Sequence, residues 1–169
     1  MSAIRTILVA TDFSESSQEA FDVALGNARD TGADVHALYV VPDPLNLPWV
    51  VEGAGMDFIE LQRTWMADAR RELTQMLTAR AVDPAKVKAT VALGTPAVEI
   101  IRHAAHWKAD LIVVGSHGRG TMGRLLIGSV AQKVLHEAGC PVMVVPHRRA
   151  KTVTTARETG RSEPAVVMN

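Results

Sequence analysis

Residues 111–131 read LIVVGSHGRGTMGRLLIGSVA, an apolar run followed by five glycines within fourteen positions. A continuous apolar run of this length is typical of a parallel strand that is covered on both faces of its sheet. Glycine directly after such a strand permits positive φ and lets the backbone approach another group closely. That group is often a phosphate, so the stretch predicts a buried strand that ends at an anion site.

Five β-branched segments are predicted as strands, at residues 6–10, 35–41, 87–93, 111–114 and 142–145. The segment VKATVAL alternates in part, which favours an edge strand, whereas ILVA, LIVV and VMVV are apolar throughout. Helical stripes lie between the strands, and Thr95-Pro96 marks the start of one of them. This alternation predicts an α/β fold with a single open, parallel five-stranded sheet and helices on both faces.

The composition of the chain limits the classes of binding partner and the cellular compartment that we expect. Lys and Arg together number 18, as do Asp and Glu, so no net charge favours nucleic acid or an anionic membrane. No apolar run approaches the roughly 20 residues that cross a bilayer, and the first residues lack the pattern of a secretory signal. With a single cysteine, Cys140, we expect a cytoplasmic protein whose thiol is buried and inert. We expect one domain, residues 1–147, and a polar tail, residues 148–169.

Three nucleotide-binding patterns compete for the glycine-rich stretch. A Walker A loop is excluded because Thr121 stands where its lysine is required. Residues 118–123, GRGTMG, match G-x-G-x-x-G, but they follow the fourth strand and no acidic residue ends the next one, which disfavours a dinucleotide fold. The third pattern, Gly115-x2-Gly118-x9-Gly128-Ser129, covers more of the stretch.

This third pattern resembles the nucleotide-binding signature of the universal stress protein family, in its ATP-binding branch. The segments ILVATDFSESSQEAFDVAL, LYVVPDP and GSVAQKVLHEAGCPVMVVP are similar to other parts of that family, so the resemblance covers about residues 3–146. It implies the strand order 3-2-1-4-5, which makes strands 1 and 4 neighbours at a topological switch point. It also implies ATP, or ADP or AMP, as ligand, with Mg²⁺ as an optional companion ion, and an unidentified protein partner. Finally, it implies a homodimer through Val142–Val145, an apolar edge that needs cover.

The candidate nucleotide-binding residues come from the ends of strands 1, 2 and 4 and from the start of the last helix. They are Ala10, Thr11, Asp12, Val40, Val41, Gly115, Ser116, His117, Gly118, Arg119, Gly128, Ser129 and Val130. Bare N–H groups at the glycines can face an anion, and the positive end of the helix that starts at Gly128-Ser129 attracts phosphate. Asp12 can accept hydrogen bonds from the sugar or the base. The resemblance implies that the backbone at Val41 contacts adenine.

Several of these residues also have a purely structural interpretation. Ser129 with Gln132 forms the capping-box pattern S-x-x-Q, which needs no ligand. Asp12 can cap the first helix, although Ser14 is equally well placed to do so.

The histidines have alternatives of their own. His117 and its neighbour Arg119 can neutralise phosphate charge, or they can be exposed residues of the loop. His103 and His106 have a spacing that can bind metal, but without a third ligand nearby we expect a solvated helix face and no metal site.

We therefore expect an adenine-nucleotide-binding regulatory protein of the stress response. No set of residues resembles a catalytic base with its nucleophile, and no lysine-bearing phosphate loop is present, so we expect no dedicated enzyme. Two alternatives stay open: a nucleotide-free interaction module, whose glycines serve only the turn, and a slow ATP-hydrolysing or phosphoryl-transferring enzyme. The enzyme would need a metal-binding acid facing the phosphates, for which Asp12 is the candidate.

Overall fold

The computed structural model describes residues 3–43, 57–83, 85–118 and 127–146. Within them the strands form one sheet of order β3-β2-β1-β4-β5, and every neighbouring pair is parallel. The strands are β1 (Thr6–Thr11), β2 (Asp34–Val41), β3 (Val87–Leu93), β4 (Leu111–Gly115) and β5 (Val142–Val145). The predicted fold class and strand order are confirmed. β1 and β4 each run one residue beyond the predicted end, because Thr11 still pairs with Tyr39 and Gly115 with Val145.

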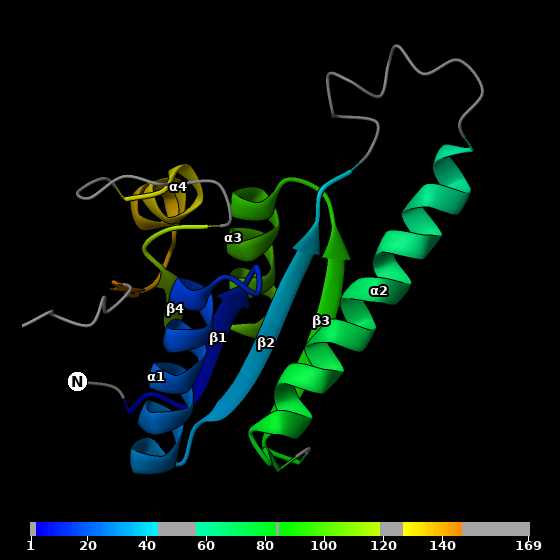
Figure 1. The fold of residues 1–169 in the computed structure, drawn as a ribbon. Coiled ribbons are helices and arrows are strands. Elements are labelled where there is room, and N and C mark those ends of the chain that lie inside the picture. The colour runs from blue at the N-terminus through cyan, green and yellow to red at the C-terminus, as the bar shows by residue number, and fades with distance from the viewer. Residues whose placement is uncertain (1–2, 44–56, 84, 119–126, 147–169) are drawn as a thin grey trace, which may run out of the picture.

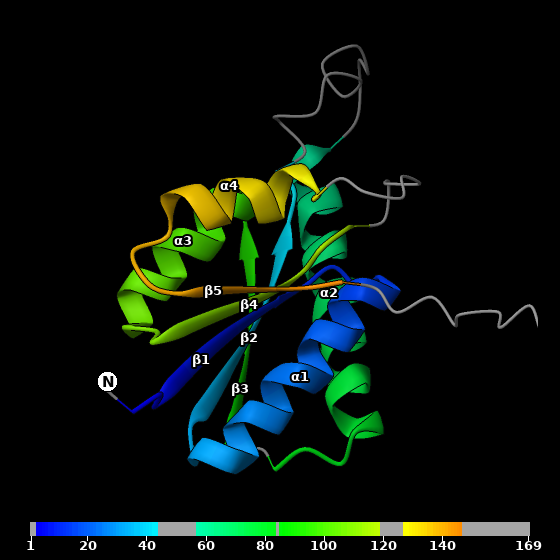
Figure 2. The ribbon, with the colours of Figure 1, turned by 90° about the vertical axis from the view of Figure 1, so that its left-hand side faces the viewer.

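Helices cover both faces of the sheet. They are α1 (Glu15–Thr31), α2 (Phe58–Ala79), α3 (Pro96–Trp107) and α4 (Ser129–Glu137). Figures 1 and 2 show α1 and α2 on one face of the sheet and α3 and α4 on the other. We call these the α1/α2 face and the α3/α4 face.

A separate hydrophobic core fills the space under each helical layer. On the α1/α2 face, Ile7 and Val9 of β1 pack in one buried cluster with Phe21 of α1. On the α3/α4 face, Leu8 of β1 shares a cluster with Val134 of α4. Successive residues of a strand point to opposite faces, so covering both faces requires each residue of the central strands to be apolar. This explains the continuous runs ILVA and LIVV.

The helix starts settle the capping alternatives. Ser14, and not Asp12, is the N-cap of α1, because its side chain accepts the backbone N–H of Ser17. Thr95 stands at the N-cap position before Pro96, as predicted, but its side chain makes no capping hydrogen bond.

The capping-box interpretation of Ser129 is wrong. The N-cap of α4 is Gly128, which places Ser129 inside the helix, one position too late to cap it. The backbone N–H of Gln132 donates to the carbonyl of Gly128, as in an ordinary first turn. Among the described residues no side chain caps α4, and its first turn offers N–H groups that another partner can bind.

The edges of the sheet agree with the sequence pattern. β3, the partly alternating strand, is one edge, and β5 is the other. Residues 142–144 of β5 are only partly buried in the single chain. The homodimer through Val142–Val145 stays a prediction, as does the boundary with the tail, since residues 147–169 lie outside the described part of the chain.

Two further expectations concern the thiol of Cys140 and the absence of a membrane-spanning segment. Cys140 is only partly buried, because it lies in the short turn between α4 and β5, and burial together with the nearby Asp110 raises the pKa of its thiol. A raised pKa keeps the thiol protonated and unreactive, in line with an inert side chain. No helix among the described residues is long and apolar enough to span a membrane.

Asp110 ties the start of β1 to the start of β4. Its Oδ2 accepts the backbone N–H groups of Arg5, at 2.8 Å, and Thr6, at 3.0 Å. These two hydrogen bonds hold the pKa of the Asp110 carboxyl below its ordinary value. The charged carboxylate therefore stabilises the native state, and the stabilisation is present above the unfolded-state pKa and lost as pH falls through the lower folded-state pKa.

We predict that Asp110→Ala lowers the melting temperature at pH 7, because two N–H groups at the start of β1 lose their acceptor. The difference from the wild type should shrink as pH falls below about 4, where the wild-type carboxyl also loses its charge. Thermal unfolding followed by circular dichroism measures both effects. Asp68→Ala, which removes an exposed ion pair with Arg71, is the control and should have little effect. A pH-independent difference would contradict the assigned role of the charge.

Candidate functional site

A pocket of about 490 Å³ opens at the carboxyl ends of the strands, on the α3/α4 face. β1 and β4 are neighbours in the sheet, but their following segments go to helices on opposite faces. Loops that diverge in this way leave a crevice at the switch point of a parallel sheet. The pocket is lined by Ala10, Thr11, Asp12, Ser17, Leu38, Tyr39, Val40, Pro42, Pro96, Ile100, Val114, Gly115, Ser116, His117, Gly118, Gly128, Ser129, Val130 and Ala131.

The lining has an apolar part and a polar part. Leu38 and Val40 of β2 and Ile100 of α3 belong to the buried core of the α3/α4 face and form an apolar wall. Asp12 and the 115–118 segment supply polar groups and bare backbone. A pocket of this kind suits a ligand with a flat apolar end and an anionic end.

Short backbone hydrogen bonds join Ser116, the residue after β4, to the end of β5 and to the start of α4. The N–H of Ser116 donates to the carbonyl of Val145 at 2.8 Å, and the N–H of Gly128 donates to the carbonyl of Ser116 at 2.7 Å. Residues twelve positions apart are thereby held side by side. The first turn of α4, with Ser129, Val130 and Ala131 on the pocket lining, thus presents its positive end there.

Gly115 is required by a close approach of the backbone. A Cβ at this position would lie 2.6 Å from Oγ of Ser16 and 2.8 Å from the backbone nitrogen of Ser17. The first turn of α1 therefore packs directly on the end of β4. Gly115 serves this packing, in addition to any contact with a ligand.

Gly118 serves a different purpose, which involves Asp12. A Cβ at Gly118 would lie 2.8 Å from Oδ2 of Asp12. The other carboxylate oxygen of Asp12, Oδ1, accepts the N–H of Ser14 at 3.1 Å and its hydroxyl at 2.5 Å. Asp12 is thus held between the start of α1 and the glycine-rich segment, with its carboxylate on the pocket lining.

His117 is held by its backbone and by its ring. Its N–H lies 3.4 Å from Oγ of Ser16, and its Nδ1 lies 2.8 Å from Oγ of Ser116. Nε2 is buried and has no hydrogen-bond partner among the described residues. The ring is therefore not a freely solvated loop side chain, although no described contact assigns it to a ligand.

All of the predicted site residues line the pocket except Val41 and Arg119. Val41 follows Tyr39 by two positions, so its side chain points to the α1/α2 face, and its carbonyl accepts the N–H of Gly94 at 2.9 Å. Arg119 lies outside the described residues. The structure brings the remaining residues together, and their part in binding stays a prediction.

Several lining residues were not predicted from the sequence: Ser17, Leu38, Tyr39, Pro42, Pro96, Ile100, Val114 and Ala131. Alternation along β2 could have found Leu38, two positions before the predicted Val40. Pro96 and Ile100 carried no such signal, because α3 reaches the pocket only through the packing of the α3/α4 face.

The expectation of a solvated face for His103 and His106 holds only for His106. His103 is packed under Trp107, with ring centroids 4.7 Å apart, and its Nε2 lies 3.7 Å from Glu99. Burial, with a smaller contribution from Arg102, lowers the pKa of His103. Among the described residues no group of three or more His, Cys, Asp or Glu side chains is arranged to hold a metal.

Comparisons with known proteins cover the same region. A family model described as the universal stress protein family matches residues 3–146. The chain is 39% identical over 147 residues to a universal stress protein of Thermus aquaticus, covering 83% of this chain and 98% of the relative. It is 36% identical over 141 residues to a universal stress protein of Methanocaldococcus jannaschii, covering 83% and 81%.

Solved structures are similar over most of the chain. The universal stress protein UspA from Lactobacillus plantarum has a TM-score of 0.71 at 28% identity and covers 86% of this chain and 99% of its own. A universal stress protein solved in complex with cAMP has a TM-score of 0.59 at 26% identity, covering 87% of this chain and 100% of its own.

We predict that Gly115→Ala destabilises the protein by about 1–3 kcal/mol, because the added methyl group forces α1 away from β4. Gly128→Ala should leave the stability close to that of the wild type. Its Cβ would have ordinary contacts, the nearest at 3.4 Å from the carbonyl oxygen of Ser116, and its φ of −61° suits any residue. Urea unfolding of the three proteins measures the difference. Equal stability of both variants would refute the packing role of Gly115.

Proposed function

This chain belongs to the universal stress protein family, and from that premise we propose that it binds an adenine nucleotide and acts as a regulatory protein rather than an enzyme. One observation carries the proposal. Asp12 and the 115–118 and 128–131 segments, about a hundred residues apart in the sequence, converge on one pocket at the switch point of the sheet. A relative of similar fold was solved with cAMP, which supports an adenine nucleotide as the ligand class.

The division of the pocket suggests how the ligand lies. The phosphates face the first turn of α4 and the backbone near Gly118, where the positive end of the helix attracts anions. The base occupies the apolar wall of Leu38, Val40 and Ile100. Asp12, held next to Gly118, accepts hydrogen bonds from the nucleoside.

We propose ATP as the preferred nucleotide, with ADP and AMP as weaker alternatives and Mg²⁺ as an optional companion of the phosphates. This assignment rests on the spacing Gly115-x2-Gly118-x9-Gly128-Ser129, and it is supported by the first turn of α4, which lies on the pocket lining.

The proposal of a non-enzymatic role rests on the surroundings of the pocket hydroxyls. Ser116 and His117 have the distance of a nucleophile and its base, 2.8 Å between Oγ and Nδ1. An activated nucleophile also needs a group that orients the base, and no described residue accepts a hydrogen bond from Nε2 of His117. Ser116 is itself buried, which restricts attack by its hydroxyl.

We also propose where the protein is located, how it assembles and what kind of partner it has. We place it in the cytoplasm, as a homodimer through β5, with an unidentified protein partner that reads the nucleotide-bound state. The partly buried apolar residues 142–144 support the dimer, because an apolar edge strand is stabilised by a second strand.

We predict that ATP binds to the ligand-free wild type at one site and that Gly128→Val weakens the binding tenfold or more. The valine side chain would stand at the start of α4, between the phosphates and the helix N–H groups, and it fits the extended backbone there. Gly139→Val is the matched control, because a Cβ at Gly139 meets nothing within 4 Å and the residue is not on the pocket lining. Isothermal titration calorimetry measures all three proteins.

The outcomes separate the rival functions. Absence of binding to the wild type at millimolar ATP would refute the nucleotide proposal and favour the interaction module. Equal affinity of wild type and Gly128→Val would refute the assigned phosphate site while leaving the ligand in place.

We also predict that turnover of ATP stays far below the roughly 1–100 s⁻¹ of dedicated kinases, because no described residue orients His117 as a base for the Ser116 hydroxyl. A phosphate-release assay at saturating ATP and Mg²⁺ measures the rate. Release within that range would move the protein to the enzyme class.

A further inference from the structure

Phe13, at the turn between β1 and α1, has an unusual backbone conformation. Its φ is 63°, in the left-handed region that favours glycine. A bulky residue keeps such a conformation only where the surrounding structure holds it, and residues of this kind gather at functional sites. Phe13 directly follows Asp12, whose carboxylate lies on the pocket lining.

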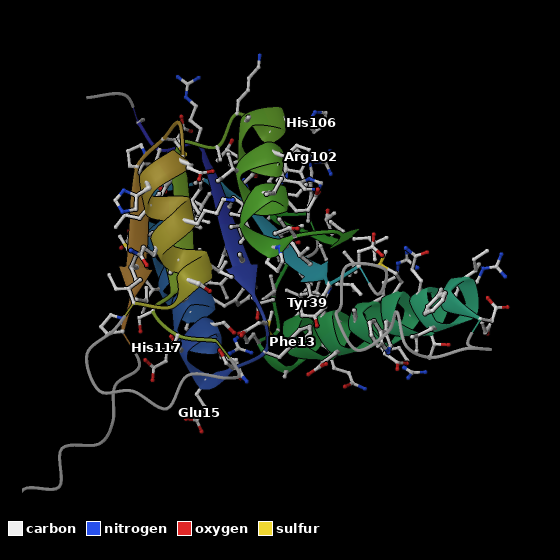
Figure 3. All side chains as sticks on the ribbon, turned by 90° about the horizontal axis from the view of Figure 1, so that it is seen from above. Phe13, Glu15, Tyr39, Arg102, His106 and His117 are labelled. Atoms are coloured by element: carbon white, nitrogen blue, oxygen red, sulfur yellow. The ribbon has the colours of Figure 1, made fainter. Side chains whose placement is uncertain are left out.

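Hydrogen bonds and a ring contact hold Phe13 in place, and its carbonyl accepts a hydrogen bond from Nε2 of Gln18 at 3.1 Å. Its N–H donates to Oγ1 of Thr11 at 3.0 Å, which closes a tight turn around Asp12. Its ring stacks on Tyr39 of β2, with centroids 4.6 Å apart and planes 23° from parallel. Figure 3 shows the two labelled rings side by side, and both pack on the core of the α1/α2 face.

The turn sends Asp12 and Phe13 in opposite directions. Asp12 lies on the pocket lining next to Gly118, whereas Phe13 is absent from that lining and packs on the α1/α2 face behind it. The stack therefore acts as an anchor for the residue that follows Asp12. Ser14, which follows Phe13, donates two hydrogen bonds to Oδ1 of Asp12. The backbone of Phe13 therefore sets where Ser14 holds the carboxylate.

We propose that Phe13 and Tyr39 are positioning residues, whose stacked rings hold the left-handed turn that presents the Asp12 carboxylate to the nucleoside. The inference rests on the proposed function, because it assigns Asp12 to the nucleoside end of a nucleotide. Pre-organising a binding group lowers the entropy lost on binding. Loss of the stack thus weakens nucleoside recognition without removing any atom of Asp12, and it leaves the phosphate end of the pocket unchanged.

Phe13→Gly is the primary variant, because glycine adopts the left-handed conformation without strain but has no ring to stack on Tyr39. We expect affinity for ATP to fall about tenfold, the scale of one charge-assisted hydrogen bond, while affinity for inorganic triphosphate stays within about twofold. Lys108→Gly is the matched control. Lys108 also has a left-handed φ, 52°, at the end of α3, and it is not on the pocket lining, so its replacement should change neither affinity.

Phe13→Tyr tests rescue, since it keeps an aromatic ring over Tyr39, and it should bind ATP as the wild type does. Tyr39 is the single tyrosine of the chain, so the NMR signal of its labelled ring reports the stack directly. That signal should shift in Phe13→Gly and stay near its wild-type position in Phe13→Tyr.

The controls decide each outcome. Wild-type ATP affinity in folded Phe13→Gly, or equal losses for ATP and triphosphate, would overturn the positioning role while leaving the proposed function intact. If Phe13→Gly does not fold, Phe13→Leu and Tyr39→Leu decide through a double-mutant cycle on ATP affinity. The single losses should then not add, because each variant removes the same stack, and additive losses would overturn the inference. Absence of ATP binding to the wild type would refute the proposed function itself.

Discussion

The pairing of β1 with β4 is the interaction on which the rest of the site depends. Ile7 pairs with Leu111 and Val9 with Val113, so two segments about a hundred residues apart become neighbours in the sheet. The strands share a direction, and both therefore end at the same edge. The chain then leaves β1 for α1, on one face, and leaves β4 toward α4, on the other. The pocket is a direct consequence of this divergence.

Close packing at that edge sets the requirements on individual residues. α1 begins directly over the end of β4, which leaves no room for a side chain at Gly115. Gly118 makes room for the carboxylate of Asp12, and Gly128 is under neither steric nor conformational pressure from the protein itself. The three glycines of one motif thus have three different surroundings: Gly115 is required by helix packing, Gly118 by the placement of a polar group, and Gly128 leaves the backbone bare at a helix start. The last of these is the one that a ligand would explain.

The two faces of the sheet contribute differently to the pocket. The α3/α4 face supplies its walls, through Leu38, Val40 and Ile100. On the α1/α2 side, Tyr39 reaches the pocket lining and stacks on Phe13, which lies behind the pocket and fixes the turn after Asp12. A group that lines the pocket is therefore held by packing on the opposite side of the sheet. Pre-organisation of this kind distinguishes a binding site from a gap between loops.

The sequence by itself determined the fold class, the strand positions and most of the pocket lining. The reason is that burial on both faces leaves a continuous apolar signature in ILVA and LIVV, and loop glycines mark where those strands end. Only the tertiary structure decided which residues of other elements reach the pocket. Pro96 and Ile100 arrive through helix packing, and the backbone carbonyl of Val41 accepts the N–H of Gly94. The cap of α4 at Gly128 and the left-handed turn at Phe13 were likewise undecided, because each depends on contacts between segments distant in the sequence. Local residue patterns carry periodicity and propensity, whereas contacts between distant segments exist only once the sheet and its helices have assembled.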